Sequence, residues 1–186
     1  MRLFNEYRYD ASYEIIKRVY TSIYQAIYAC NLLIDNFTKE GAYSSKVVDR
    51  CIAEARVVRA WCHMTAALTW QRPPLVDHCL TDEDPTNVES QKFLLDWCID
   101  ECAAAIPNLR ERSSKLDKDA TTYVTKGFAQ FVAGKSAVFA NEMDVARKYL
   151  GDLINSGKYE LVPGDRWWEN FHAPGDGNEE KIFEPN

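Results

Sequence analysis

The chain has 186 residues, of which 46% are hydrophobic and 27% are charged, and this is the composition of a globular domain rather than of a disordered segment. Its 28 acidic residues outnumber its 22 Lys and Arg, and no dense basic cluster is present, which argues against nucleic acid as a partner. The longest uncharged run, residues 19–34, contains Thr, Ser, Gln and Asn and falls short of the roughly 18 apolar residues that a membrane-spanning helix needs.

The cysteines and histidines show no metal-binding spacing. The six cysteines, at positions 30, 51, 62, 79, 98 and 102, form no CxxC pair, and the three histidines are far apart in the sequence without an HExxH motif. We therefore expect no metal and no cofactor, and we expect most cysteines to be small buried side chains. Their even number leaves disulfides open if the protein is exported.

Two long helices are predicted in the first half of the chain. From Tyr13 to Ile34 the apolar residues recur in steps of three and four, the spacing of a helix that faces a core, and Gly41 is a plausible stop. A second helix is predicted to begin after Ser45 as N-cap and to end near Trp70, because two prolines follow at once.

Three further helices are predicted downstream. A capping-box pattern at Thr86–Glu89 predicts the start of the third helix, which should end before Pro107. The fourth is predicted over 120–140, with Phe131 and Val138 among its core residues. Asn141 is then expected to cap a fifth helix, whose core residues include Ile154 and whose end is marked by Gly157.

The predicted fold class is therefore all-α, with about five main helices arranged as tetratricopeptide-like hairpins and a loop-rich tail. Gly134 and Ala146 lie twelve residues apart, as the close-packing positions of a tetratricopeptide repeat require. We expect a single domain with helical pairs over 1–162 and a loop-rich segment over 163–186. The abrupt end of the chain favours a fragment of a longer protein.

Several motifs occur in an order that is typical of one family. The first motif is Tyr24-x-x-Ile27-x-x-x-Asn31. The second is a block of Glu54, Arg56, Arg59 and Ala60, which is followed by Pro-Leu-Val at 74–76. The others are Ile-Pro at 106–107, Ser-Gly-Lys-Tyr-Glu-Leu at 156–161 and the segment from Asn to Glu at 178–184. This series resembles the SusD/RagB family of outer-membrane nutrient-binding lipoproteins. The match departs from the family at 71–73, where Gln-Arg-Pro replaces Gly-Gly-Val, and at Cys102, where the family has Ala.

The resemblance implies a helical N-terminal part of a longer protein. Such proteins are lipid-anchored at the bacterial cell surface, lie over a TonB-dependent (SusC-like) outer-membrane transporter, and capture oligosaccharides or sometimes peptides for import. It also implies that the anchoring cysteine and the second half of the protein lie outside this sequence.

The charged cluster at Glu54, Arg56 and Arg59 has a structural interpretation. Glycoside hydrolysis uses two facing carboxylates, and this cluster has one. We expect the two arginines to bind a neighbouring helix end or loop carbonyl. Asn31 beside an apolar stripe predicts a buried amide that bonds to a neighbouring backbone.

Aromatic residues are the candidates for ligand contact. Tyr7 and Tyr9 flank Arg8 ahead of the first regular helix, where a loop would present rings to the faces of sugars. Trp167 and Trp168 lie in the tail, and on an extended segment their indoles would point to opposite sides. Tyr13 and Tyr20 lie on the apolar stripe, so we interpret them as packing residues.

The sequence thus predicts a binding protein without chemistry of its own, in which rigid helical pairs hold ligand loops. The leading hypothesis is a cell-surface, lipid-anchored glycan-binding protein that serves a TonB-dependent transporter. Two alternatives stay open at this point: a cytosolic tetratricopeptide-like adaptor that binds a peptide, and a glycan-processing enzyme of helical fold.

Overall fold

The computed structural model describes residues 5–8, 10, 13–39, 41–82 and 84–184. Among these residues the regular structure is helical and no strand is present. The main elements are five α-helices, α2 (Glu14–Thr38), α3 (Lys46–Trp70), α4 (Gln91–Ala105), α5 (Lys126–Phe139) and α6 (Met143–Asn155). The predicted all-α class is therefore confirmed.

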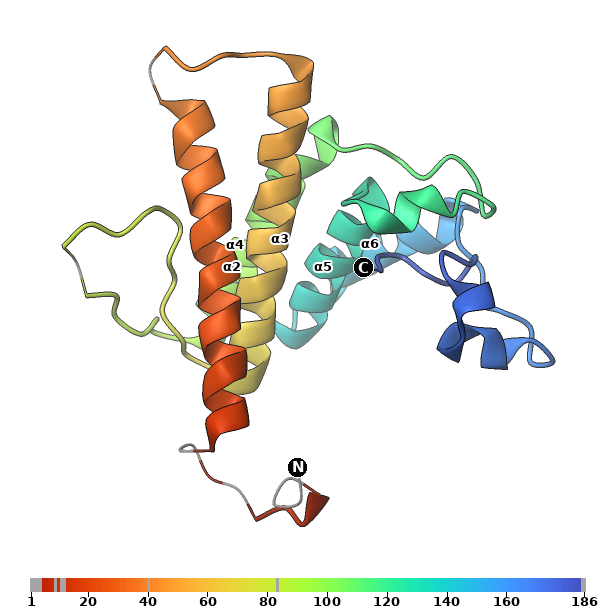
Figure 1. Cartoon of the computed structure of the whole chain (residues 1–186), viewed down its shortest axis with the longest axis horizontal. Helices are drawn as coiled ribbons and strands as arrows, with labels where there is room; N and C mark the ends of the chain where they lie inside the picture. The colour runs from red at the N-terminus through yellow and green to blue at the C-terminus, as the bar shows by residue number, and fades with distance from the viewer. Residues whose placement is uncertain (1–4, 9, 11–12, 40, 83, 185–186) are drawn as a thin grey trace.

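Each helix packs against the next one along the chain, and α3 also contacts α5. Figure 1 shows α2 and α3 standing side by side as a long hairpin, with α5 and α6 on the far side of α3 from α2. This succession of paired helices is the tetratricopeptide-like arrangement that the sequence predicts. The tail adds two short 3₁₀ helices, η3 (Trp167–Phe171) and η4 (Ala173–Gly175).

The start of α3 follows the sequence signal closely. The Ser45 hydroxyl accepts a hydrogen bond from the backbone N–H of Val48 at 3.2 Å, so one of the unpaired amides of the first turn is satisfied. At the other end the helix stops at Trp70, and Gln71 has a positive φ of 65°. Both predicted ends of this helix are confirmed.

The predicted start of the third helix is wrong. The structure begins α4 at Gln91, and the hydroxyl of Ser90 rather than Thr86 accepts the capping hydrogen bond, from Phe93 N–H. Asn87 instead forms an isolated antiparallel bridge with Pro74. That bridge holds the residues around Asn87 in an extended conformation, which a helical first turn does not allow.

Two more boundaries differ from the prediction. The fourth helix begins at Lys126 rather than near residue 120, because the chain first makes a short 3₁₀ turn, η2 (Asp119–Thr122), and then caps α5 with the hydroxyl of Thr125. Asn141 has a positive φ of 63° and lies in the turn, whereas Glu142 holds the N-cap position of α6. An N-cap residue has an extended backbone, so Asn141 does not serve as one.

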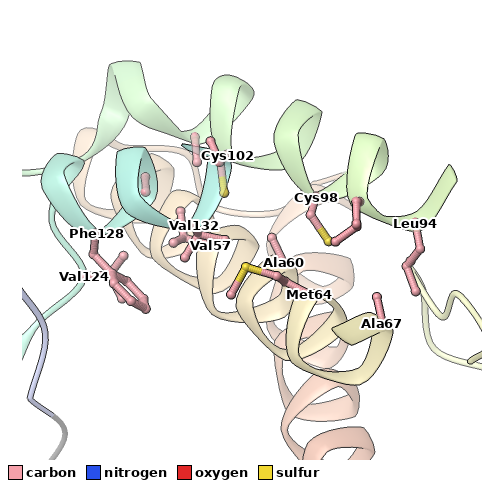
Figure 2. Close-up of a cluster of buried hydrophobic side chains, with 14 of the residues drawn as sticks. Val57, Ala60, Met64, Ala67, Leu94, Cys98, Cys102, Val124, Phe128 and Val132 are labelled. Atoms are coloured by element: carbon pink, nitrogen blue, oxygen red, sulfur yellow. The ribbon is translucent and has the colours of Figure 1, made fainter. Parts of the chain in front are cut away.

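The core lies between α3, α4 and α5. Figure 2 shows side chains of these three helices converging, with both sulfur-bearing residues of α4, Cys98 and Cys102, among them. All six cysteines are free, and those at 30, 62, 98 and 102 are buried. Burial raises the pKa of the Cys62 thiol to about 12, so it stays protonated and behaves as a small apolar side chain.

Not every predicted core residue is buried. Val138 is 41% exposed and Ile154 is 73% exposed, whereas Phe131 lies half-buried against the core. The helical period places Val138 and Ile154 near their apolar stripes, but the described part of the chain provides no helix to cover that side. The core assignment of these two residues is therefore wrong.

A buried arginine attaches the tail to the helices. Arg112 is 1% exposed, and its guanidinium donates hydrogen bonds to five backbone carbonyls, three of which belong to Gly177, Asn178 and Lys181 in the tail. The ring of Tyr159 lies 5.1 Å from the guanidinium carbon. Because all three nitrogens of this buried group donate to backbone carbonyls, and three of those carbonyls belong to the tail, Arg112 fixes the tail against the helices.

The close-packing role predicted for Gly134 and Ala146 is confirmed. A Cβ atom added at Gly134 would lie 2.5 Å from Cγ of Leu150, and Ala146 is 4% exposed. The two helices α5 and α6 therefore approach each other at a point where only a hydrogen atom fits.

Substituting this glycine tests the packing. Gly134→Ala is expected to lower the free energy of unfolding by about 1–3 kcal/mol through overpacking against Leu150, although alanine is the better helix former. Gly151→Ala is the matched control, because a Cβ there meets nothing within 4 Å, and it should raise stability by about 0.5–1 kcal/mol. Urea unfolding monitored by circular dichroism measures both, and equal effects would contradict the packing argument.

Candidate ligand-binding surface

A buried polar cluster links three helices, α2, α3 and α4, to the loop that follows α3. Arg59 of α3 is 4% exposed, and its guanidinium donates to the amide oxygen of Asn31 on α2 at 2.7 Å. The same guanidinium donates to the carbonyl of Asp77 in the loop after α3 and forms an ion pair with Glu101 of α4 at 2.5 Å. We call Asn31, Arg59 and Glu101 the buried clamp.

Asn31 completes the clamp from the other side. Its amide nitrogen donates to the carbonyls of Val76 at 3.0 Å and His78 at 2.8 Å, and the residue is 1% exposed. The predictions for Asn31 and Arg59 are therefore confirmed. Arg56 differs, because its guanidinium makes no hydrogen bond with another described residue and its Nε is buried.

Glu54 has the structural role that the sequence predicts. Its carboxylate lies 3.3 Å from a guanidinium nitrogen of Arg110 and 3.9 Å from Nε of Arg50. Arg110 in turn lies with its guanidinium carbon 3.5 Å from the centre of the Tyr123 ring. The described residues contain no group of three His, Cys, Asp or Glu side chains that would hold a metal ion.

A buried histidine, His63, shares the carbonyl of Val76 with Asn31 of the clamp, and it is 0% exposed. One ring nitrogen, Nε2, lies 3.2 Å from the carbonyl of Val76, which fixes the neutral tautomer with hydrogen on Nε2. Burial lowers the pKa of His63 to about 4; the Val76 carbonyl opposes this shift and the charge of Arg59 adds to it.

One face of α2 carries a row of aromatic rings. Tyr20, Tyr24 and Tyr28 are spaced by one helical turn, and Tyr20 also meets Trp70 at the end of α3 with ring centres 5.0 Å apart. We call these four residues the aromatic strip. The hydroxyl of Tyr24 donates to the carbonyl of Pro74 at 2.7 Å, which ties the strip to the clamped loop.

The strip borders a shallow groove of about 420 Å³, lined by the three tyrosines together with Thr21 and Gln25. Tyr24 and Tyr20 lie with ring centres 4.7 Å apart, so their rings support each other. Tyr28 is 56% exposed, and its hydroxyl has no hydrogen-bond partner among the described residues. An exposed ring beside a groove on a rigid helix is suited to contact the apolar face of a sugar.

The ligand residues predicted from the sequence lie elsewhere. Tyr7 is 87% exposed and Arg8 approaches Glu6 at 3.6 Å, whereas Tyr9 lies outside the described residues. Figure 1 shows the N-terminal segment below α2 and the dark-blue tail at the right, apart from each other. Within this chain the two predicted groups therefore do not form one site.

The two tryptophans of the tail are on a helical turn rather than an extended segment. Trp167 and Trp168 begin η3 and are 58% and 46% exposed. Trp167 packs edge-on to Phe171, and Trp168 lies near His172. The expectation that the two indoles point to opposite sides is wrong, because it assumed an extended segment. In a 3₁₀ helix, successive residues are instead rotated by about a third of a turn.

The sequence analysis interprets Tyr20 as a packing residue and does not name Tyr28 or Trp70 as ligand contacts. The feature that indicates the strip is the spacing of Tyr20, Tyr24 and Tyr28 at every fourth residue, which places three rings on one face of a helix. Trp70 could not be added from the sequence, because its position beside Tyr20 depends on how α2 and α3 pack.

The histidine gives a pH-dependent prediction. The unfolded chain takes up a proton on His63 near its ordinary value of 6.5 and the folded chain only near pH 4, so the free energy of unfolding should fall as the pH drops through this window. The contribution of His63 to this loss is about 3 kcal/mol. Urea unfolding at a series of pH values measures it against His63→Gln, whose curve should lack this step; parallel curves would contradict the assignment.

The comparisons with known proteins match this chain to solved structures only. No protein-family model matches the chain, and no curated protein does. A SusD-like carbohydrate-binding protein of Bacteroides fragilis has a TM-score of 0.80 and 26% identity over 95% of this chain and 34% of its own. No helix among the described residues is long and apolar enough to cross a membrane.

Two other solved structures share the fold. A SusD superfamily protein of Bacteroides vulgatus has a TM-score of 0.83 and 20% identity over 98% of this chain and 38% of its own. A laminarin-binding SusD-like protein has a TM-score of 0.69 and 20% identity over 83% of this chain and 35% of its own. The chain thus spans about a third of the length of the proteins it matches. The resemblance found in the motifs is confirmed, since the chain is similar in structure to SusD-like proteins along nearly its whole length.

Proposed function

We propose that this chain is part of a cell-surface protein that binds oligosaccharide and delivers it to a TonB-dependent outer-membrane transporter. The observation that carries the proposal is the similarity over 95% of the chain to a SusD-like carbohydrate-binding protein. A second solved relative is described as laminarin-binding. The aromatic strip supports the proposal, because its rings are suited to contact the apolar faces of sugars.

In this proposal the protein acts by preorganisation. The buried clamp fixes α2, α3 and the loop that follows α3, so the rings of the strip are in place before ligand arrives. A rigid surface loses little conformational entropy on binding, which leaves more of the contact energy for affinity. Tyr7, Arg8 and Tyr9 near the N-terminus, and Trp167 and Trp168 in the tail, belong to the proposal as ligand contacts at two further surfaces that are separate from the strip.

We also propose that the protein binds its ligand without cleaving it and that residues 1–186 are one helical domain of a longer, lipid-anchored chain. Supporting the second point, Leu161 and Ile154 border an apolar groove of about 410 Å³ on the tail side of α6. Such a surface is typical of a face that another part of a protein covers. The full open reading frame tests this directly, and a frame confined to these residues would contradict it.

Glycan binding is tested at Tyr28. Tyr28→Ala should weaken binding of a laminarin or xyloglucan oligosaccharide about tenfold, or ~1.4 kcal/mol, through loss of ring contact, as measured by isothermal titration calorimetry. Tyr43→Ala is the matched control, because Tyr43 is 76% exposed and lies outside the strip. Trp167→Ala tests the tail in the same assay.

Three results would count against these proposals. Equal affinities for Tyr28→Ala and the unaltered chain would remove the strip from the ligand surface. Absence of binding to every glycan on an array would contradict glycan capture itself. Release of free sugar by the purified protein would show that it is an enzyme.

The transporter partner is tested in the native membrane. Affinity purification of the full-length protein from outer-membrane extract is expected to recover a TonB-dependent transporter. Extract passed over the same resin without the protein serves as the control for adventitious capture. Recovery of soluble cytosolic proteins without a transporter would instead favour the peptide-binding adaptor.

A further inference from the structure

The loop 71–90 joins α3 to α4 and contains no helix among its described residues. Figure 1 shows it in yellow-green beside α2, on the side away from α5 and α6. Connections that run beyond about 12–15 residues without secondary structure are uncommon in compact domains and usually carry a function. We therefore asked what holds this loop in place and what could release it.

We call residues 74–79 of this loop the strap, because side chains of α2 and α3 hold its backbone. In addition to the hydrogen bonds from the clamp and from Tyr24, the backbone N–H of Cys79 donates to the Asp35 carboxylate of α2 at 3.0 Å. The side chain of Val76 is buried against the same two helices. Hydrogen bonds from side chains thus fix the path of the strap.

The carbonyl of Val76 is the central anchor of the strap, and one of its two donors is a histidine. Asn31 donates to it from α2, and Nε2 of His63 donates to it from α3. The other ring nitrogen, Nδ1, is buried and has no hydrogen-bond partner among the described residues. A second proton on this imidazole would have to go on Nδ1, where it would be a buried donor without an acceptor.

The groups around this imidazole do not compensate a positive charge. The ring of Tyr24 on α2 and that of Trp97 on α4 lie edge-on to it, with ring centres 6.2 Å and 5.1 Å away. Burial is the main reason that its pKa is lowered to about 4; the charge of Arg59 adds to this shift, and that of Asp77 in the strap opposes it. Glu101 of α4 is already paired with Arg59.

Acid therefore favours a state in which the strap has left His63. An imidazole that meets water takes up its proton near the ordinary value of 6.5, whereas the closed structure takes it up only near pH 4. Each pH unit lost in this window should raise the ratio of open to closed strap about tenfold. Release breaks bonds from side chains and leaves the backbone hydrogen bonds of α2 and α3 intact.

Opening of the strap reaches the aromatic strip through Tyr24. The hydroxyl of Tyr24 donates to the carbonyl of Pro74, which belongs to the strap. Tyr20 in turn lies with its ring centre 4.7 Å from that of Tyr24. When the strap leaves, Tyr24 loses its partner, so the rings are no longer fixed before ligand arrives and binding loses more conformational entropy.

We propose that the strap is a pH-controlled switch of the aromatic strip, in which protonation of His63 releases the strap and release weakens glycan binding. The regulatory part of this inference rests on the proposed function of the strip. The opening itself involves no ligand, so the two can be tested separately.

Hydrogen exchange on the ligand-free, full-length protein tests the opening. After correction for the intrinsic exchange rate, protection of the Cys79 amide should fall about tenfold per pH unit between pH 6.5 and pH 4. The amide of Ala133, buried in α5, should remain better protected at each pH, since the helices stay folded. Equal protection of the two amides, or protection of Cys79 that does not change with pH, would overturn the switch.

Two histidine variants assign the effect. His63→Gln keeps a side-chain donor for the Val76 carbonyl but takes up no proton, so the pH dependence at Cys79 should disappear. His78→Gln is the matched control, because His78 is an exposed histidine of the same strap, and it should keep the dependence. If His63→Gln fails to fold, NMR titration of the His63 ring in the unaltered protein should coincide with the loss of Cys79 protection. The opposite result in either experiment contradicts the assignment.

The effect on the ligand is measured by isothermal titration calorimetry with a laminarin oligosaccharide at pH 7 and pH 4.5. Affinity should fall at the lower pH in step with the fraction of closed strap, in the unaltered protein and in His78→Gln but not in His63→Gln. Affinity that is equal at both pH values would overturn the regulation while leaving glycan binding supported. Absence of binding at pH 7 would contradict the proposed function, and with it the regulation of that function.

Discussion

The rest of the structure depends on one buried charge, the guanidinium of Arg59. A charge removed from water is costly unless nearby groups replace its hydration, so Arg59 must have its partners in place. Those partners come from α2 through Asn31, from α4 through Glu101, and from the loop after α3 through the carbonyl of Asp77. Moving any of the four segments would leave a buried polar group unpaired, and this fixes their relative positions.

The clamp fixes the position of α2 and therefore of the rings that α2 presents. These rings are supported by Trp70 and by the hydrogen bond from Tyr24 to Pro74. On the far side of α3, α5 and α6 approach each other closely at Gly134, where a Cβ atom would meet Leu150.

Predictions based on short-range signals succeeded where no distant contact competed with them. Ser45 is followed by an uninterrupted apolar period, and the helix begins there. Thr86 has an equally good capping pattern, but the bridge between Asn87 and Pro74 holds that segment extended. At Asn141 the chain turns with a positive φ to bring α6 onto α5, which a cap at that residue would prevent. Each failure is a place where packing overrides local preference.

The sequence by itself determined the helical class, the extent of α3, the burial of Asn31 and the family resemblance, because these depend on periodicity, capping and motif order along the chain. Only the tertiary structure decided which groups meet, such as Arg59 with Glu101 and Trp70 with Tyr20. The reason is that periodicity fixes the face on which a residue lies, whereas a contact between helices also requires their relative positions along and around each axis.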